Sequence, residues 1–288
     1  MGRKPLATSM GSKRHVETSI CLWVDLLGYG AMLRKVEFNP VAPEAQQAIA
    51  RLFQFQEIVA THSHKIFHTM VINDGCVAYR DLSPRSRAVT YDFVNRSYRL
   101  FKAINDNELA NGYPGARAVI AAGFRARRND GTIKHLAHGI GNTLINQIKS
   151  GQISAEEAIK KAVSIQPNHD AIASLQANFA FTKAYLIDAA GSGGGFLGNN
   201  FYLDANLLPS IVPDWITTTE SIHFEEPGLS GEIIKVDALK LLPLNHPCND
   251  LLNAFEVAEK LCLDSDIRTK LKELRRTPTR PSLLKTNG

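Results

Sequence analysis

Two aspartates, Asp25 and Asp74, stand where predicted strands end, and together they could hold metal ions. Asp25 follows the apolar run Ile20–Val24, and Asp74 lies in Asn73–Gly75, whose Asp-Gly pair is a strong hairpin signal. If these strands pair, two carboxylates meet beside the glycine-bearing loop Leu27–Gly30. Two divalent ions that hold a triphosphate need such hard oxygen ligands and backbone N–H groups. Either aspartate alone would be an ordinary turn or strand end, so the hypothesis depends on both.

The elements that must position these carboxylates follow in a definite order. Apolar residues at helical spacing predict a helix over Pro43–His62, and a strand–turn–strand hairpin follows over Ile66–Arg80. Ser83-Pro84 predicts the start of a helix that runs to about Asn105, and Ala116–Phe124 predicts a strand. The order strand, helix, hairpin, helix, strand is typical of the ferredoxin-like βαββαβ fold. We therefore expect an α/β (α+β) domain with an antiparallel sheet and C-terminal helical and β additions.

The rest of the chain is predicted to extend this core. The expected helices are 136–149, 154–163, 169–189 and 249–275, and the expected strands are 201–204 and, within an irregular stretch 207–244, short ones near 222–224 and 233–236. The expected organisation is a flexible basic N-terminus (1–17), a catalytic domain (18–245, with a core 18–125 and an extension 126–245), a C-terminal helix (246–276) and a disordered tail (277–288).

Composition narrows the class of protein. The chain has 288 residues, 44% of them hydrophobic, and no apolar run long enough to span a membrane. The polar N-terminus has no apolar segment of a signal peptide, and the four cysteines are scattered without metal-site spacing, so we expect a cytoplasmic protein. Much of the net charge of +5 lies in the two tails, without the interleaved aromatic residues that bind nucleic acid. We expect neither a nucleic acid nor a membrane partner.

Several other motifs carry no function. The Gly193–Gly198 stretch matches G-x-G-x-x-G, but it follows a predicted helix and precedes a strand, the reverse of a dinucleotide fold. The pairs His62/His64 and His135/His138 have no adjacent third zinc ligand.

With these residues in view, the chain resembles the class III nucleotide cyclases. Val24–Tyr29 (VDLLGY) is similar to that family's first strand and loop, and Asp74 follows Asn73 where the family usually has glycine. Arg117 and Gly123 match the arginine and glycine of the family's later strand. The resemblance covers about residues 18–125. Beyond it the chain departs from the family, whose helix carries asparagine and, four residues later, arginine; here Asn178 is followed at that spacing by Thr182.

The second part of the resemblance is to the pyrimidine cyclases of bacterial Pycsar antiphage systems. The LGYG loop, the FAFTKAY stretch and the FYLD strand are similar to that subgroup. The subgroup implies a homodimer with shared active sites, two Mn²⁺ or Mg²⁺ ions per site, and cUMP or cCMP made from UTP or CTP. It also implies a separate effector protein that senses the cyclic nucleotide in antiviral defence.

The resemblance assigns roles to particular residues. The metal ligands would be Asp25, Asp74 and the Leu26 carbonyl, and the phosphates would be held by backbone groups of Leu27, Gly28, Tyr29 and Gly30. Asn178 would orient the ribose across the dimer. Thr182 stands where the family has its arginine, so Lys183 or Arg125 would offset charge at the α-phosphate.

The choice of base depends on His68. Purine-specific members of the family have a lysine six residues before the hairpin aspartate, and here that residue is His68. We expect the bulkier ring to favour a one-ring base, and Arg117, from the adjoining strand, to donate to uracil O4. The expected order is UTP over CTP, and both over ATP and GTP. A purine cyclase, a catalytically silent nucleotide-binding or sensor domain, and a basic nucleic-acid-binding module are the alternatives.

Overall fold

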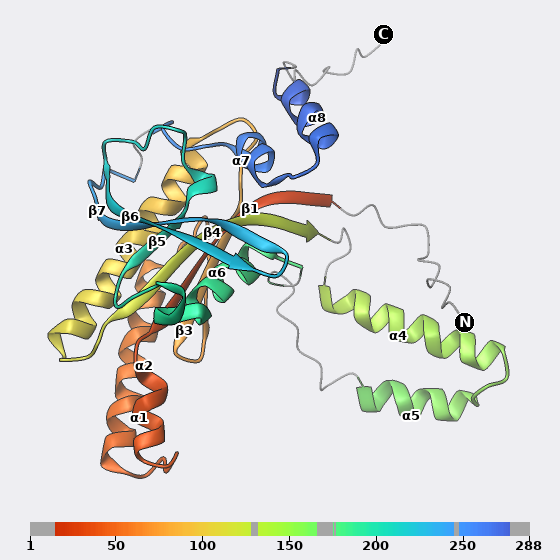
Figure 1. Ribbon diagram of the computed structural model, residues 1–288. Coiled ribbons are helices and arrows are strands. Elements are labelled where there is room, and N and C mark those ends of the chain that lie inside the picture. The colour runs from red at the N-terminus through yellow and green to blue at the C-terminus, as the bar shows by residue number, and fades with distance from the viewer. Residues whose placement is uncertain (1–14, 128–131, 166–174, 176, 245–247, 277–288) are drawn as a thin grey trace, which may run out of the picture. The chain divides into compact units, whose positions relative to one another are not determined.

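The computed structural model describes residues 15–127, 132–165, 175, 177–244 and 248–276. The chain divides into two compact units, one formed by residues 1–16 and 126–178 and the other by residues 17–125 and 179–288. Figure 1 labels most elements of both units with the names used below.

The second unit holds the expected βαββαβ core, apart from residues 15–16 and 126–127. Its elements are β1 (His15–Leu26), α1 (Tyr29–Lys35), α2 (Pro43–His62), β2 (Thr69–Ile72), β3 (Gly75–Asp81), α3 (Ala88–Ala110) and β4 (Ala116–Arg127). The described strands form one seven-stranded, mostly antiparallel sheet with the order β2-β3-β1-β4-β5-β7-β6. Its first four strands have the ferredoxin-like order, and the predicted fold class is confirmed.

Strand pairing brings the ends of β1, β3 and β4 together. The antiparallel register of β1 and β3 places Asp25 opposite Gly75, next to the turn that carries Asp74. On the other side of β1, the Leu27 N–H donates to Gly115 O at 3.0 Å, just before β4 begins. The C-terminal end of β1 therefore lies between the hairpin turn and the start of β4.

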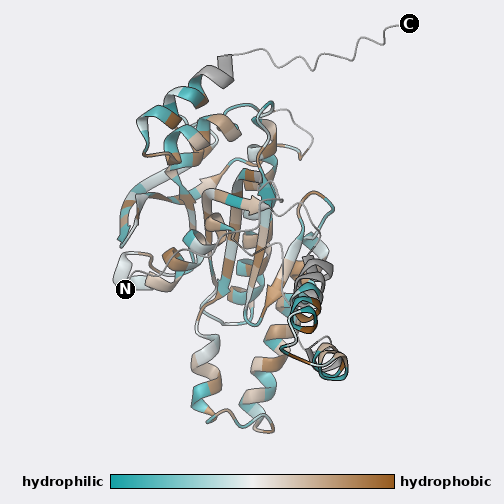
Figure 2. Ribbon diagram, turned by 90° about the vertical axis from the view of Figure 1, so that its right-hand side faces the viewer, coloured by the Kyte–Doolittle hydropathy of each residue, from teal (hydrophilic) through white to brown (hydrophobic). Residues whose placement is uncertain are grey.

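The two faces of the sheet differ in what covers them. Alternate residues of β1 (Ile20, Leu22, Val24 and Leu26) join a buried cluster with residues of α2 and α3 such as Phe55 and Phe93. The intervening residue Trp23 faces the opposite side, where its ring meets Phe181 and Tyr185 of α6 (Phe179–Ala190) edge-on. Figure 2 shows the apolar residues in brown along the central strands. Asp25, two residues after Trp23, therefore lies on the α6 face.

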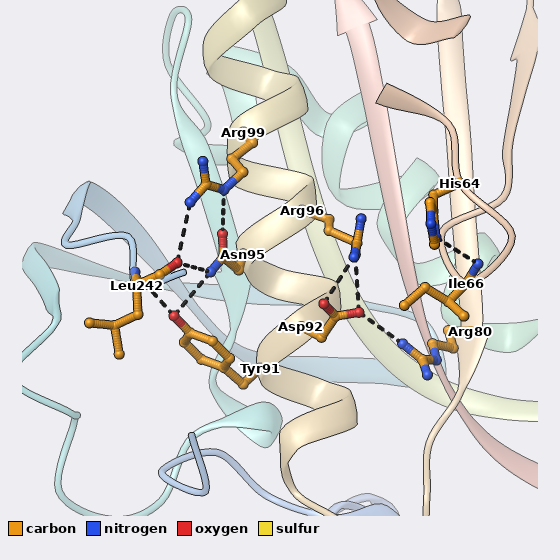
Figure 3. Close-up of polar contacts among 9 residues, drawn as sticks. All are labelled: His64, Ile66, Arg80, Tyr91, Asp92, Asn95, Arg96, Arg99 and Leu242. Carbon is orange, nitrogen blue, oxygen red and sulfur yellow. Dashed lines mark hydrogen bonds and ion pairs between the residues drawn. The ribbon is translucent and has the colours of Figure 1, made fainter. Parts of the chain in front are cut away.

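Polar contacts also tie α3 to its surroundings (Figure 3). Asp92 accepts from Arg80 of β3 and from Arg96 one turn further along the helix. Asn95 donates to the Leu242 carbonyl, and Arg99 donates to the same oxygen. These contacts hold α3 against the sheet and against the segment after β7.

The remaining elements of this unit are η1 (Gly191–Gly194), β5 (Phe201–Asp204), η2 (Ala205–Leu207), β6 (Ile216–Glu226), β7 (Leu229–Leu239), α7 (Ala254–Leu261) and α8 (Ser265–Arg276). Strand β5 pairs parallel with β4, and β7 pairs antiparallel with β5 and β6. The predicted bounds of α2 and β5 are confirmed. The long β6–β7 ribbon was expected only as two short strands. Few of its residues alternate between buried and exposed, so its sequence carries little of the alternating apolar pattern that marks a strand.

Three predicted boundaries are wrong for identifiable reasons. Ser83 accepts from the Arg85 and Ser86 N–H groups in a turn, and α3 begins only at Ala88. The single predicted C-terminal helix is two helices, because Asp264 accepts from two backbone N–H groups and starts α8 anew. Helix α6 begins at Phe179, and residues 169–174 and 176 of the helix expected over 169–189 lie outside the described residues.

The first unit contains α4 (Thr132–Lys149) and α5 (Ala155–Ile165). Ser154 and Glu157 form the predicted capping box, since each side chain accepts from the other residue's backbone N–H. The predicted tail, 277–288, and residues 1–14 lie outside the described part of the chain. Among the described helices, none combines the length and apolar character needed to cross a membrane.

Candidate active site

The two candidate metal ligands converge at the end of the β1–β3 pair. The Leu26 N–H donates to the Asp74 carbonyl oxygen at 3.1 Å, which fixes the hairpin turn against β1. Asp74 Oδ1 accepts from Asn73 Nδ2 at 2.7 Å. Asp25 and Asp74 are both half-buried, so their carboxylates are held by the fold yet remain accessible.

The turn that carries Asp74 differs from the simple Asp-Gly turn predicted from sequence. The residue with positive φ is Asn73, at +54°, and Gly75 is already the first residue of β3. A Cβ on Gly75 would lie 2.6 Å from the Trp23 ring, so glycine is required there for packing. Trp23 therefore occupies the space above Gly75, between the strands that carry Asp25 and lead to Asp74.

The surroundings of Asp25 disfavour its negative charge. Burial, and then the nearby carboxylates of Asp188 and Asp74, raise the pKa of Asp25, and Arg117 and Arg51 lower it; together they bring it to about 7. A bound cation would relieve this repulsion. A strongly shifted carboxyl group in such a cluster is a feature of functional sites.

Asp188 is a member of this cluster that the sequence reasoning missed. It lies in α6, where Oδ2 accepts from Trp23 Nε1 at 3.1 Å and Oδ1 accepts from Arg117 Nε at 2.5 Å. Arg117 also donates through Nη2 to the Asp188 carbonyl and through Nη1 to the Phe196 carbonyl. No local motif marks Asp188, because its partners are contributed by β1 and β4.

The loop after β1 turns directly into a helix. Gly28 has a φ of +76°, which favours glycine, and it is the N-cap of α1. The first backbone N–H groups of a helix have no carbonyl partner within it, so those of Gly28, Tyr29 and Gly30 are suited to bind anionic oxygens. Gly28 is exposed and Tyr29 is buried, so the loop is open on one side and anchored on the other.

These donors fit magnesium or manganese better than zinc. Asp25, Asp74 and the Leu26 carbonyl offer only oxygen, which hard cations prefer. Within the described residues no group of three or more His, Cys, Asp or Glu side chains could enclose a metal by itself. Magnesium sites of this kind typically use one or two carboxylates and complete the coordination with water and substrate phosphates. The residues present therefore fit a cation that is shared with a phosphate ligand.

The two predicted cationic residues, Lys183 and Arg125, each form an ion pair with a carboxylate of this chain. Lys183 is buried, and its Nζ lies 2.6 Å from Asp204 Oδ2. Arg125 forms a two-armed ion pair with Asp81, at the end of β3 remote from Gly75, and its guanidinium lies 5.2 Å from the centre of the Tyr79 ring. The structure does not bring Arg125 to the pair of aspartates, because Asp81 is six residues along β3 from Gly75.

The residues expected to read the base are not neighbours. His68 is exposed and lies one residue before β2, whereas its neighbour Phe67 is fully buried in the core cluster. Strands β3 and β1 lie between β2 and β4, so Arg117 is not on a strand adjoining His68. That separation is about 14 Å across the sheet. This part of the expectation is wrong, since adjacency in the sheet was inferred without the strand order.

Asn178 is the residue just before α6. It is buried and belongs to the unit formed by residues 1–16 and 126–178. Thr182, four residues further, is exposed on α6. The ribose-orienting role of Asn178 stays a prediction.

No protein-family model matches the sequence, and no curated protein sequence matches it. Solved structures with a similar arrangement include the guanylyl cyclase Cya2, at 12% identity and a TM-score of 0.43 over 83% of this chain and 99% of that chain. The adenylyl cyclase CyaB from P. aeruginosa is similar at 10% identity and 0.43 over 80% and 100%. A bacterial light-regulated adenylyl cyclase is similar at 11% and 0.42 over 80% and 95%. With values this low, any activity must be argued from the residues of the site.

Proposed function

We propose that this chain is a nucleotide cyclase, which converts a nucleoside triphosphate to its 3′,5′-cyclic nucleotide and pyrophosphate. The observation that carries the proposal is the convergence of Asp25 and Asp74 beside the loop at Gly28. The sequence resemblance to class III cyclases in Val24–Tyr29 and at Arg117 and Gly123 points to the same reaction.

The proposed roles follow from the geometry of the site. Asp25, Asp74 and the Leu26 carbonyl bind Mn²⁺ or Mg²⁺, two ions per site. Such ions, when bound, favour ionisation of the ribose 3′-hydroxyl and offset the charge of the phosphates. The backbone N–H groups of Gly28, Tyr29 and Gly30 bind the β- and γ-phosphates. The 3′-oxygen forms a bond to the α-phosphorus, the bond to pyrophosphate breaks, and the hydroxyl proton passes to water.

The structure changes which cations the proposal uses. Lys183 and Arg125 each have a carboxylate partner within the chain, Asp204 and Asp81, so we assign them to the scaffold. Asn178 keeps its proposed role in orienting the ribose.

We propose a preference for pyrimidine triphosphates, UTP over CTP. The support is His68, which replaces the purine-specific lysine with a shorter, bulkier side chain that lies exposed beside β2. The proposed donation from Arg117 to the base is dropped, because three of its N–H groups donate to Asp188 and Phe196.

We also propose that the enzyme acts as a homodimer with shared sites. Three large apolar side chains of α6 are exposed, Phe179 (60%), Tyr185 (49%) and Leu186 (37%). A second copy of the chain would bury this surface. The cyclic nucleotide would then act as a second messenger read by a separate effector protein in antiviral defence, as the Pycsar resemblance implies.

One experiment tests the activity and the base preference together. The purified protein is incubated with equal concentrations of UTP, CTP, ATP and GTP and Mn²⁺, and the products are identified by mass spectrometry. We expect cUMP to predominate over cCMP. Mainly cAMP or cGMP would favour the purine alternative, and triphosphate binding without any cyclic product would favour the silent sensor domain.

A further inference from the structure

Arg51 is a fully buried arginine whose side chain reaches the loop at Gly28 from inside the core. It lies in α2 and is 0% exposed, and its ion-pair partner Glu108, in α3, is 1% exposed. Arg51 Nε and Nη2 donate to Glu108 Oε2 at 2.9 and 2.5 Å. The guanidinium also lies 4.5 Å from the centre of the Tyr113 ring. These contacts fix the plane of the guanidinium.

The same guanidinium holds the backbone of the loop. Arg51 Nη2 donates to the Leu27 carbonyl oxygen at 2.9 Å, and the Leu27 N–H donates to the Gly115 carbonyl at 3.0 Å. Leu27 is therefore held on both sides, by α2 and by the segment before β4. Gly115 is itself constrained, because a Cβ there would lie 2.3 Å from Asn105 Oδ1.

The orientation of one peptide group follows from these bonds. In a planar trans peptide the C=O and the following N–H point in opposite directions. Since the Leu27 C=O points to the buried Arg51, the Gly28 N–H points away from the core. Gly28 is exposed, so this N–H faces the open side of the loop.

We propose that Arg51 is a positioning residue for phosphate binding: by holding the Leu27 C=O, it directs the Gly28 N–H toward the β- and γ-phosphates of the substrate. This inference deepens the proposed function and rests on it. Glu108 offsets much of the guanidinium charge, so the proposed role of Arg51 in phosphate binding is carried by the geometry of the loop. Glu108 in turn keeps the guanidinium in the orientation that reaches Leu27.

A merely structural role can be separated from this one. Removing Arg51 alone leaves Glu108 buried without its partner, which destabilises a protein whatever the pair does for function. Replacing both partners with apolar residues of similar size avoids that effect, but still removes the hydrogen bond to Leu27. The informative variants are therefore Arg51→Met/Glu108→Met and the conservative Arg51→Lys, which keeps the charge without the planar two-armed donor.

The control is Arg80→Met. Arg80 also forms an ion pair with a helix residue, Asp92 of α3, and Asp92 keeps Arg96 as a partner when Arg80 is removed (Figure 3). The probe is inorganic tripolyphosphate with Mg²⁺, titrated by calorimetry into each full-length variant after circular dichroism has shown that it is folded. Steady-state KM and kcat for the preferred triphosphate are measured in parallel.

We expect the double variant to bind tripolyphosphate about 10- to 100-fold more weakly, because the hydrogen bond from the Gly28 N–H to a charged phosphate oxygen is lost. The KM should rise with little change in kcat, Arg51→Lys should shift in the same direction, and Arg80→Met should match the wild type. If the double variant does not fold, Arg51→Lys decides the question.

Two results would overturn the assignment of Arg51: wild-type affinity for tripolyphosphate in the folded Arg51 variants, or no tripolyphosphate binding by the wild type. Suppose the wild type binds tripolyphosphate, the Arg51 variants bind it more weakly, and no protein makes a cyclic nucleotide. That result would refute the proposed function and leave the positioning role of Arg51 in place.

Discussion

Arg117 Nε lies 2.5 Å from Asp188 Oδ1, and this ion pair joins β4 to α6 beside the candidate metal ligand Asp25. Both members act on Asp25, Asp188 raising its pKa and Arg117 lowering it. Trp23 Nε1 donates to the other oxygen of Asp188, so the carboxylate is held in place from two sides. The protonation of Asp25 therefore depends, after burial, on a carboxylate that another element holds in place.

Replacing Asp188 tests this relationship. Asp188→Asn removes one negative charge near Asp25 while an oxygen remains to accept from Arg117, so the pKa of Asp25 should fall. The pH at which Mn²⁺ binding reaches half of its maximum should then move down by about half a unit or more. Calorimetric titration of Mn²⁺ between pH 5.5 and 8 measures the shift. An unchanged or raised midpoint in the folded variant would contradict the proposed influence of Asp188.

The pKa of Asp25 also predicts how stability depends on pH. Because the folded-state pKa, about 7, lies above the unfolded value of 3.8, the folded state binds the proton more tightly. Stability should therefore fall as the pH rises from about 4 to 7 and then level off. Asp25→Asn cannot ionise, so its stability does not fall in this way. Without metal it should be more stable than the wild type at pH 8 by about 1 to 3 kcal/mol, a value reduced for the partial solvent exposure of Asp25.

Urea unfolding at pH 5 and pH 8 in the presence of EDTA measures this difference. Mn²⁺ should raise the Tm of the wild type more at pH 8 than at pH 6, because it competes with the proton for Asp25. Equal stability of the wild type and Asp25→Asn at pH 8 would show that Asp25 is not held in an unfavourable environment.

Lys183 is expected to stabilise the fold. Lys183→Met leaves the buried Asp204 without its cation and should lower the free energy of unfolding by about 3 to 5 kcal/mol. The matched control is Lys102→Met, which removes an exposed i,i+4 pair with Asp106 and should change stability by at most about 0.5 kcal/mol. Chemical denaturation of both variants decides the point. A Lys183→Met protein of wild-type stability but without activity would restore Lys183 as a candidate catalytic residue.

Shared active sites predict complementation between two inactive proteins. Asp74→Ala removes a metal ligand and Asn178→Ala removes the proposed ribose contact, and each alone should be inactive. In a mixed dimer one of the two sites carries neither substitution, so the mixture should regain up to about a quarter of wild-type activity. Subunit exchange is verified with differently tagged chains. No recovery in verified mixed dimers would show that each site is built from one chain.

The part of the fold that depends on local signals was predictable from the sequence. The bounds of α2 and β5, and the pairing of the Asp25 strand with the Asp74 hairpin, follow from apolar periodicity and turn residues. Helix α1 was missed, because its seven residues follow Gly28 and include Gly30, which disfavours helix. Asp264 is a residue type that commonly starts a helix, and it precedes α8, but the sequence-based prediction did not use it.

The partners of buried charges were not predictable. Arg51–Glu108, Arg117–Asp188 and Lys183–Asp204 join residues 57, 71 and 21 positions apart, and no local pattern states which charges meet. For the same reason the sequence offered Lys183 and Arg125 as catalytic cations, although the fold pairs both with carboxylates.

The central claim is that Asp25 and Asp74 carry the cyclisation, and its most direct test is the rate of cyclic nucleotide formation in four proteins. These are the wild type, Asp25→Asn, Asp74→Asn and the control Asp106→Asn, whose carboxylate is exposed on α3. With Mn²⁺ and the preferred triphosphate, we predict equal rates for the wild type and Asp106→Asn. The two site variants, folded by circular dichroism, should be slower by at least about 100-fold. Rates near that of the wild type in Asp25→Asn and Asp74→Asn would contradict the account.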